Sequence, residues 1–181
     1  NIQINFVSEN IRFDFDEHDY DAAFHYGDPD WQHTYSHHLF DEMMLPVCSV
    51  EFRSRWNIAD EQDLARVPLI QQFSRPMAWA EWFEHAGVER KSPLQGLRFQ
   101  NFSITLEAVK AGIGAALLPY YLVEKDRRLK GIEILSNTVL PRMKGYYFVY
   151  PQKNISVPEV VAFRDWILRR AAEYKNIVIE K

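Results

Sequence analysis

The feature that most constrains the fold is the stretch of residues 99–119, where a strand end, a short helix and a second strand follow one another. Asn101 or Ser103 caps the helix, because either side chain can accept a hydrogen bond from an early helical N–H. Gly112 follows the last turn, where a left-handed residue ends many helices. Residues 115–118 are apolar without alternation, which is typical of a strand buried on both faces. The sequence therefore predicts a strand–helix–strand crossover.

The predicted helix leads to two further expectations. We expect Thr105, Glu107 and Lys110 to face solvent, since most other positions of the helix are apolar. The turn at residues 100–103 brings free N–H groups and the positive end of the helix dipole together, which favours a carboxylate. Most such turns in α/β proteins bind nothing, so this pattern alone leaves a ligand site and a plain turn both open.

Arg75 is a second candidate for ligand contact. It stands in a loop after the strand predicted at residues 69–72, next to Ser74 and before Pro76. The planar fork of a guanidinium matches the two oxygens of a carboxylate. The alternative of an ordinary surface arginine stays equally open at this point.

Composition and charge exclude several classes of protein. The 181 residues are 47% hydrophobic and 25% charged, which is ordinary for a globular chain with a sizeable core. The net charge of −4 argues against this segment itself binding nucleic acid, which needs clustered Lys and Arg. Cys48 is the single cysteine, which excludes an internal disulfide and fits a reducing compartment. No apolar stretch is long enough to span a membrane. The reducing compartment that the single cysteine fits is the cytoplasm, where we expect this protein.

Residue combinations typical of metal sites or catalysis are weak. His33 and His37 are four apart, but this stretch reads as a loop running into a strand, where that spacing does not favour a metal. The acidic residues 14–21 lack the glycine and glutamate of a calcium loop. Cys48 lies among apolar residues, so we expect an inert, buried thiol. We predict no catalytic residue, no metal and no cofactor.

Strands and helices alternate along the chain, which predicts an α/β fold. Ile2, Ile4 and Phe6 alternate with polar residues and predict an opening strand. Residues 158–174 give the clearest amphipathic helix, with proline at a favoured start position. Two extended passages, at residues 42–50 and 141–151, bracket the middle of the chain. They suit two connections between a discontinuous first lobe and an inserted second lobe.

Four segments, in this order, resemble a known family. They read DAAFHYGD (residues 21–28), LFDEMMLPVCS (39–49), FQNFS with AGIGAALLP (99–103 and 111–119), and YYFVYP with AFRDWI (146–151 and 162–167). Together they are similar to the effector-binding domain of LysR-type transcriptional regulators, in the glycine-cleavage-activator-like branch. Each segment is loose alone, and their order and spacing make the resemblance specific over nearly the whole chain.

The resemblance implies a fold like that of the type 2 periplasmic binding proteins, with two α/β lobes joined by two crossing strands. Lobe I is expected at residues 1–44 and 143–175, lobe II at 45–142, and a tail at 176–181. Family domains normally open with a strand and a helix before the strand expected at residues 2–7. Because this sequence starts at the later strand, we expect the first lobe to be incomplete. In the family, a winged helix-turn-helix domain normally lies further upstream.

The resemblance also implies what the domain binds. A small effector, expected to be an amino acid or a small carboxylate, sits in the cleft between the lobes. By position, its expected contacts are Ser8, Tyr26, Gly27, Ser74, Arg75, Asn101, Phe102 and Ser103. The full-length protein is expected to be a homodimer or tetramer that contacts DNA only through its absent N-terminal domain.

One alternative has the same architecture. A solute-binding protein that serves a transporter is also bilobal, but it carries an export leader, whereas a regulator carries a helix-turn-helix. The residues encoded upstream of Asn1 would separate the two. An enzyme on this scaffold is the weakest hypothesis, because the sequence offers no nucleophile–base pair.

Overall fold

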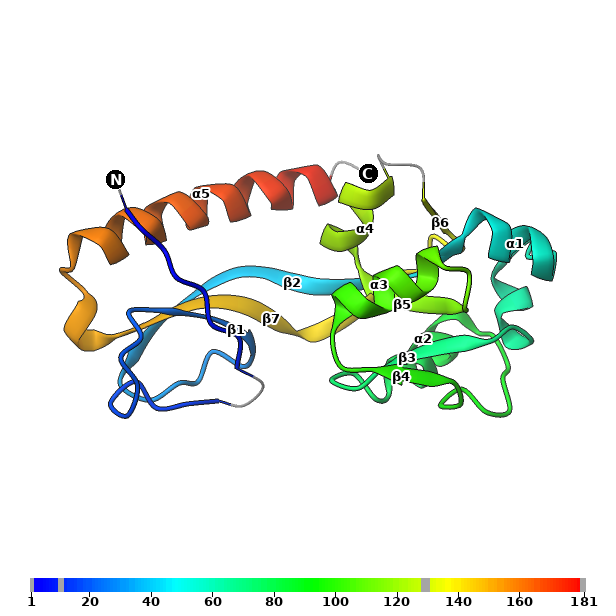
Figure 1. Ribbon diagram of the computed structural model, residues 1–181, viewed down its shortest axis with the longest axis horizontal. Helices are drawn as coiled ribbons and strands as arrows, with labels where there is room; N and C mark the ends of the chain where they lie inside the picture. The colour runs from blue at the N-terminus through cyan, green and yellow to red at the C-terminus, as the bar shows by residue number, and fades with distance from the viewer. Residues whose placement is uncertain (1, 10–11, 128–130, 180–181) are drawn as a thin grey trace. The chain divides into compact units, whose positions relative to one another are not determined.

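A computed structural model describes residues 2–9, 12–127 and 131–179 of the chain (Figure 1). Its strands are β1 (Ala23–Gly27), β2 (Thr34–Ser49), β3 (Leu69–Gln72), β4 (Leu97–Phe99), β5 (Ala115–Pro119), β6 (Ile132–Ile134) and β7 (Leu140–Pro151). Its α-helices are α1 (Val50–Trp56), α2 (Ala78–Ala86), α3 (Phe102–Lys110), α4 (Tyr120–Arg127) and α5 (Pro158–Ile179). Short 3-10 turns span Glu61–Ala65 and Gln152–Asn154.

The contacts divide the chain into two units. Unit 1 comprises Asn1–Asp41 and Met143–Lys181, and unit 2 comprises Glu42–Arg142. The chain passes from one unit to the other within β2 and within β7. No helix in the described ranges is both long enough and apolar enough to cross a membrane.

Unit 2 is built on a mixed sheet. The second half of β2 pairs antiparallel with β5 and with β6, while β3 lies between β5 and β4 and runs parallel to both. Side chains alternate between two cores across this sheet. Leu69, Ala115 and Leu117 join Trp79 and the rest of the α2 face in one core. The intervening strand residues join α3 and α4 in the other core.

The predicted crossover is confirmed as β4, α3 and β5. All five residues of β5 are buried, because the two cores cover both faces of the strand. One expectation for the helix is wrong. Thr105 is buried at 1% exposure, whereas Ile104 is 50% exposed. The buried hydroxyl of Thr105 donates to Gln72 Oε1 at 2.8 Å, and this partner removes the reason for the side chain to face solvent.

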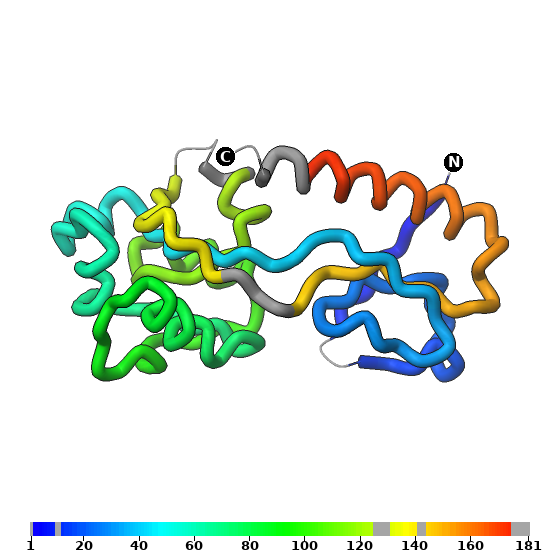
Figure 2. Tube along the Cα trace, turned by 180° about the vertical axis from the view of Figure 1, so that it is seen from behind, coloured from blue at the N-terminus to red at the C-terminus, as the bar shows by residue number. Residues whose placement is uncertain are grey.

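Unit 1 packs a helix on an antiparallel strand pair. β1 pairs with β7 from Ala23↔Val149 to Gly27↔Gly145. Helix α5 lies along the strands of this unit, as the orange and red tube of Figure 2 shows. Its apolar side joins a core that contains Leu39, Phe148, Tyr150, Val160 and Ala171. The predicted helix from residue 158 is confirmed, and it continues past residue 174 to Ile179. Residues 180 and 181 of the predicted tail lie outside the described residues.

The strand predicted at the start of the chain is wrong. Residues 2–9 have no regular secondary structure, and Ile2, Ile4 and Phe6 are exposed at 46%, 44% and 74%. A strand needs a neighbour to complete its hydrogen-bond ladder and to cover its apolar face. No described strand pairs with this segment, so alternation alone does not make a strand here.

Candidate functional site

The start of α3 carries the geometry predicted from the sequence. Asn101 is the N-cap, with an extended backbone, and its Oδ1 accepts a hydrogen bond of 2.9 Å from the Ile104 N–H. The first amides of a helix have no acceptor within the helix. Within the described ranges, no group accepts from the N–H of Phe102 or Ser103. Two adjacent amides therefore remain for water or a ligand, at the positive end of the helix dipole.

Two buried side chains fix this helix start against β3. Gln72 Nε2 donates to the Gln100 carbonyl at 2.8 Å, and Gln72 Oε1 accepts from the Thr105 hydroxyl at 2.8 Å. Gln72 thus joins the turn before α3 to the first turn of the helix. Sequence reasoning missed this role, and the available signal was the pair of amide side chains, Gln71 and Gln72, that ends a short predicted strand.

Arg75 is buried beside the same helix start. Its Nε donates to Glu42 Oε2 at 2.8 Å and its Nη2 donates to Glu42 Oε1 at 2.9 Å, with side chains only 7% and 0% exposed. Its Nη1 donates to the Ser74 carbonyl at 3.1 Å. The guanidinium carbon lies 5.6 Å from the centre of the Phe102 ring. Arg75 is therefore neither a surface arginine nor an open fork.

Glu42 is the functional neighbour that sequence reasoning missed. It comes from β2, 33 residues before Arg75, at the first position of unit 2. The feature of the sequence that could have identified Glu42 is its position directly before the apolar run at residues 43–48. A charged side chain in such a strand requires a partner when it is buried.

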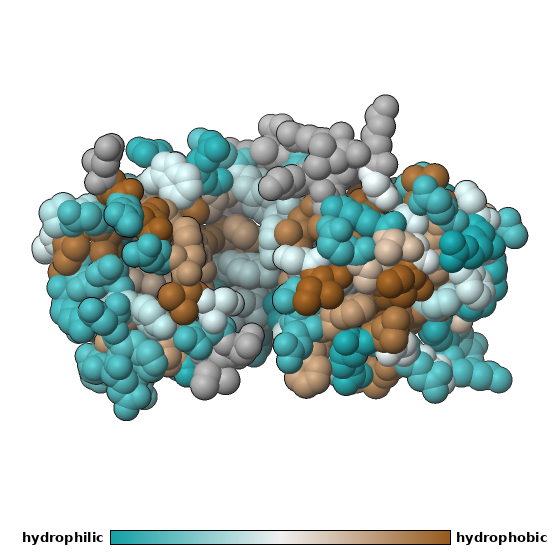
Figure 3. All heavy atoms as spheres, in the orientation of Figure 1, coloured by the Kyte–Doolittle hydropathy of each residue, from teal (hydrophilic) through white to brown (hydrophobic). Residues whose placement is uncertain are grey.

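The rim of this region is apolar. Phe73, Met77 and Ile104 are exposed at 63%, 47% and 50%. On the face of unit 2 drawn in Figure 3, apolar side chains also gather over α3 and its surroundings. A ligand whose charge rests on the two amides would place its remaining atoms near this surface.

The other predicted contacts lie in unit 1, so they are described by themselves. Ser8 is exposed in the irregular first segment. Tyr26 and Gly27 end β1, opposite Tyr146 and Gly145 of β7. The structure therefore brings together the five predicted residues of unit 2, namely Ser74, Arg75, Asn101, Phe102 and Ser103. The contribution of the three unit 1 residues stays a prediction.

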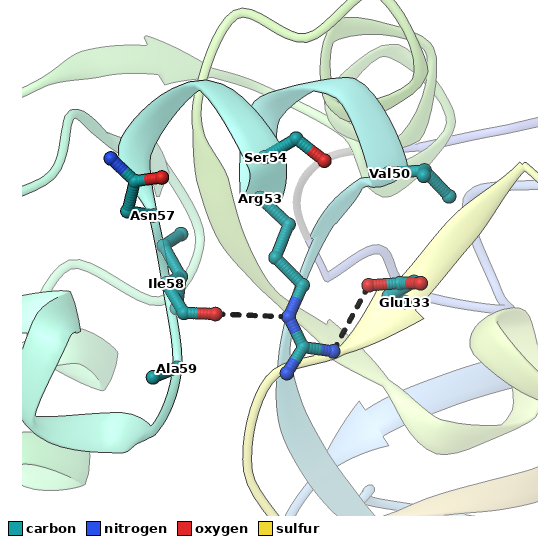
Figure 4. A pocket seen from close by; sticks show the side chains of 7 residues that line it. All are labelled: Val50, Arg53, Ser54, Asn57, Ile58, Ala59 and Glu133. Carbon is teal, nitrogen blue, oxygen red and sulfur yellow. Dashed lines mark hydrogen bonds and ion pairs between the residues drawn. The ribbon is translucent and has the colours of Figure 1, made fainter.

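A cavity of unit 2 lies elsewhere, and none of the predicted residues lines it. It has a volume of about 500 Å³ and lies against the end of α1 (Figure 4). Arg53 crosses it, donating from Nε to the Ile58 carbonyl at 3.0 Å and from Nη1 to Glu133 Oε2 at 3.0 Å. The two charged side chains that line this cavity, Arg53 and Glu133, therefore form an ion pair with each other.

Cys48 and His37, which the sequence analysis considered for reactivity and metal binding, both lie within strand β2. Burial raises the pKa of Cys48 to about 12, so its thiol is protonated at neutral pH. His37 lies in β2 and its Nε2 is 3.2 Å from the Tyr150 hydroxyl. Burial lowers the pKa of His37 below 6.5, with a smaller contribution from Arg164 in the same direction.

Comparisons with known proteins agree on the family. Residues 1–172 match the family model described as the LysR substrate binding domain. The glycine cleavage system transcriptional activator of Escherichia coli K12 is 28% identical over 155 residues, which are 85% of this chain and 50% of that protein. The transcriptional activator AmpR of Citrobacter freundii is 27% identical over 169 residues, which are 92% of this chain and 56% of AmpR. The chain thus spans about half the length of these relatives.

Solved structures agree on the fold. The effector domain of AmpR from Pseudomonas aeruginosa superposes with a TM-score of 0.82 at 24% identity, over 96% of this chain and 82% of that one. The AmpR effector-binding domain of Citrobacter freundii gives 0.78 at 25% identity, over 91% and 81%. The predicted α/β, type 2 periplasmic-binding-protein-like fold is confirmed. The chain belongs to the LysR substrate-binding-domain family, and it is the effector-binding domain of a LysR-type transcriptional regulator.

Proposed function

We propose that this domain senses a small metabolite whose carboxylate binds the amides of Phe102 and Ser103 at the start of α3. The observation that carries the proposal is this pair of unsatisfied amides, braced by Gln72 and lying beside the buried guanidinium of Arg75. Backbone amides at a helix N-terminus bind carboxylates through hydrogen bonds and through the helix dipole. An anion fits this position better than a cation.

Arg75 has an indirect role in this proposal. Glu42 occupies Nε and Nη2, so the guanidinium does not present its two-pronged face to a ligand. It lies over the Phe102 ring instead, with its central carbon 5.6 Å from the ring centre. Because Glu42 neutralises Arg75, the site has little excess positive charge. We therefore propose a ligand with a single carboxylate, an amino acid or a small monocarboxylate, over a dicarboxylate.

The test removes one amide hydrogen and leaves the helix in place. Ser103→Pro deletes the N–H of Ser103, which has no acceptor within the helix, and Ser103→Ala is the matched control that keeps it. Calorimetry of the domain against the twenty amino acids and small monocarboxylates identifies a ligand. We expect Ser103→Pro to bind it about tenfold or more weakly than Ser103→Ala. Equal affinities of the two variants would remove the amides from the site.

We further propose the role of the whole regulator. Its relatives are named transcriptional activators, which supports an oligomeric, non-catalytic cytoplasmic protein, a homodimer or tetramer, that contacts DNA through an N-terminal domain. An effector changes the protein only as far as it binds one conformational state more tightly than another. Electrophoretic mobility of promoter DNA with the full-length protein, with and without the ligand found by calorimetry, tests this role. An unchanged DNA affinity and an unchanged pattern of bound species would contradict it.

A further inference from the structure

A second cavity of unit 2 lies at the opposite end of the strands that lead to α3. It has a volume of about 280 Å³, near the lower limit of small-molecule sites, and it lies where the parallel strands β3 and β4 begin. Its lining residues are Pro68, Leu69, Ile70, Arg90, Gln95, Gly96, Leu97 and Ile113. Apart from Arg90 and Gln95, these side chains are apolar or absent.

Arg90 brings an uncompensated charge to this cavity. Its Nη1 donates to the carbonyls of Leu64 and Val67 at 2.7 and 3.0 Å, and its Nε donates to the Ser92 carbonyl at 3.4 Å. In the part of the chain that the structure describes, no carboxylate pairs with Arg90 and no group accepts from its Nη2.

The environment of Arg90 makes an added anion favourable. Burial lowers the pKa of Arg90, because the charged form loses solvation and gains no carboxylate in return. The group still stays charged at neutral pH, as arginine does throughout proteins. This half-buried cation donates to three carbonyl oxygens and lies over the Phe83 ring, 5.7 Å from its centre, but no carboxylate in the described ranges neutralises it, so it can still stabilise an anion.

The other residues that line the cavity favour an apolar group on the ligand. Leu97 and Ile113 are exposed at 56% and 45%, so apolar surface is open to an incoming group. Gly96 has φ +140°, and a Cβ at this position would lie 1.9 Å from the Leu69 carbonyl oxygen. Gly96 therefore contributes backbone and no side chain to the lining of the cavity.

We propose that this cavity binds a small organic anion with one carboxylate on an apolar body. The carboxylate accepts from Nη2 of Arg90, and the apolar body covers Leu97 and Ile113. The site is separate from the amides at the start of α3, which lie at the other end of β4. The cavity beside α1 is its natural comparison, because there Glu133 already neutralises the arginine (Figure 4).

The test uses nuclear magnetic resonance of the domain with labelled isoleucine and leucine methyl groups. Sodium hexanoate is the probe, and hexanamide and hexylammonium are its neutral and cationic analogues. We expect saturable shifts of the methyl signals of Ile70, Leu97 and Ile113 with hexanoate. The affinity for hexanamide should be about tenfold lower, and hexylammonium should not bind.

Two variants separate the site from general destabilisation. Ile113→Trp fills the cavity mouth without touching Arg90, and Ile155→Trp in unit 1 is a control of equal exposure, 45% for both side chains. We expect Ile113→Trp to abolish hexanoate binding and Ile155→Trp to leave it unchanged. Arg90→Gln should reduce binding about tenfold or more, with its melting temperature measured alongside.

Three outcomes would overturn the proposal. They are hexanoate shifts confined to Ile104 at the α3 end, equal affinity for hexanoate and hexanamide, or unchanged binding in Ile113→Trp. The first outcome would place the probe at the site proposed for the effector. The fate of this proposal is therefore separable from that of the proposed function.

Discussion

The two ends of the parallel pair β3 and β4 hold an arginine in contrasting ways. Beyond their carboxyl ends, Arg75 is buried against Glu42, with two hydrogen bonds to one carboxylate. Near their amino ends, Arg90 is half-buried and held by three backbone carbonyls, with no carboxylate in the described ranges. The residue type is the same, and the partner decides what each guanidinium can do. Arg75 serves the fold of unit 2, whereas Arg90 keeps charge available for a ligand.

The largest expected effect comes from breaking the pair at the carboxyl end. Glu42→Ala leaves the buried charge of Arg75 without its partner, and we expect a loss of about 3–5 kcal/mol in the free energy of unfolding. Urea denaturation followed by tryptophan fluorescence measures this loss, because Trp79 and Trp82 lie in the core of unit 2.

Two controls sharpen this prediction. Glu107→Ala removes a carboxylate from the exposed Lys110–Glu107 pair, and it should cost no more than about 0.5 kcal/mol. The double variant Glu42→Leu with Arg75→Met replaces the whole pair by apolar side chains, so it should be more stable than Glu42→Ala. If Glu42→Ala unfolded like the wild type, the buried pair would not hold this end of the sheet.

At the amino end, the largest effect is expected from Gly96. A Cβ in Gly96→Ala would lie 1.9 Å from the Leu69 carbonyl oxygen at a φ that side chains rarely adopt, so β3 and β4 must separate. We expect a loss of about 2–3 kcal/mol in unfolding free energy. Gly87→Ala is the control, because φ is also positive there but no atom lies within 4 Å of the added Cβ, and it should cost about 1 kcal/mol. Equal losses would show that backbone conformation, not the close approach, sets the cost.

The contrast also separates what the sequence could predict from what it could not. The crossover from β4 to β5 follows from local patterns, since the apolar run of β5 and the position of Gly112 mark it. The strand at residues 2–7 followed the same kind of pattern and is absent, because pairing depends on a neighbour that no local pattern supplies.

In the candidate site, too, contacts between residues close in sequence were predictable and contacts between distant residues were not. A cap at Asn101 or Ser103 was predictable, because capping involves residues only three apart, and the structure shows that Asn101 is the cap. The pairing of Arg75 with Glu42 joins residues 33 positions apart, and so does the bond between Thr105 and Gln72. Single-sequence patterns carry no information about such partners. The sequence therefore offered Arg75 as a candidate ligand contact and did not predict its pairing with Glu42.

A smaller effect is expected from the brace at the start of α3. Thr105→Val keeps the shape of the side chain but leaves Gln72 Oε1 buried without the hydroxyl that donates to it. We expect a loss of about 1–2 kcal/mol in unfolding free energy. The same variant should loosen the cap of α3, seen as faster hydrogen exchange at the Ile104 amide, which donates to Asn101 Oδ1, with no change in β5. Unchanged exchange rates would show that the helix start is held without Gln72.

The smallest stability effect, and the sharpest separation of the two ends, is expected from Asn101→Asp. Aspartate is as good a helix cap as asparagine, so the unfolding free energy should change by no more than about 0.5 kcal/mol. Its carboxylate would stand beside the amides of Phe102 and Ser103 and repel an anionic ligand there. Binding of the effector carboxylate should therefore weaken, while hexanoate at the Arg90 cavity should bind as in the wild type. Calorimetry with both ligands measures the two affinities in one protein. A parallel loss at both ends would mean that the two sites are one, and a loss at neither would mean that no carboxylate rests on the start of α3.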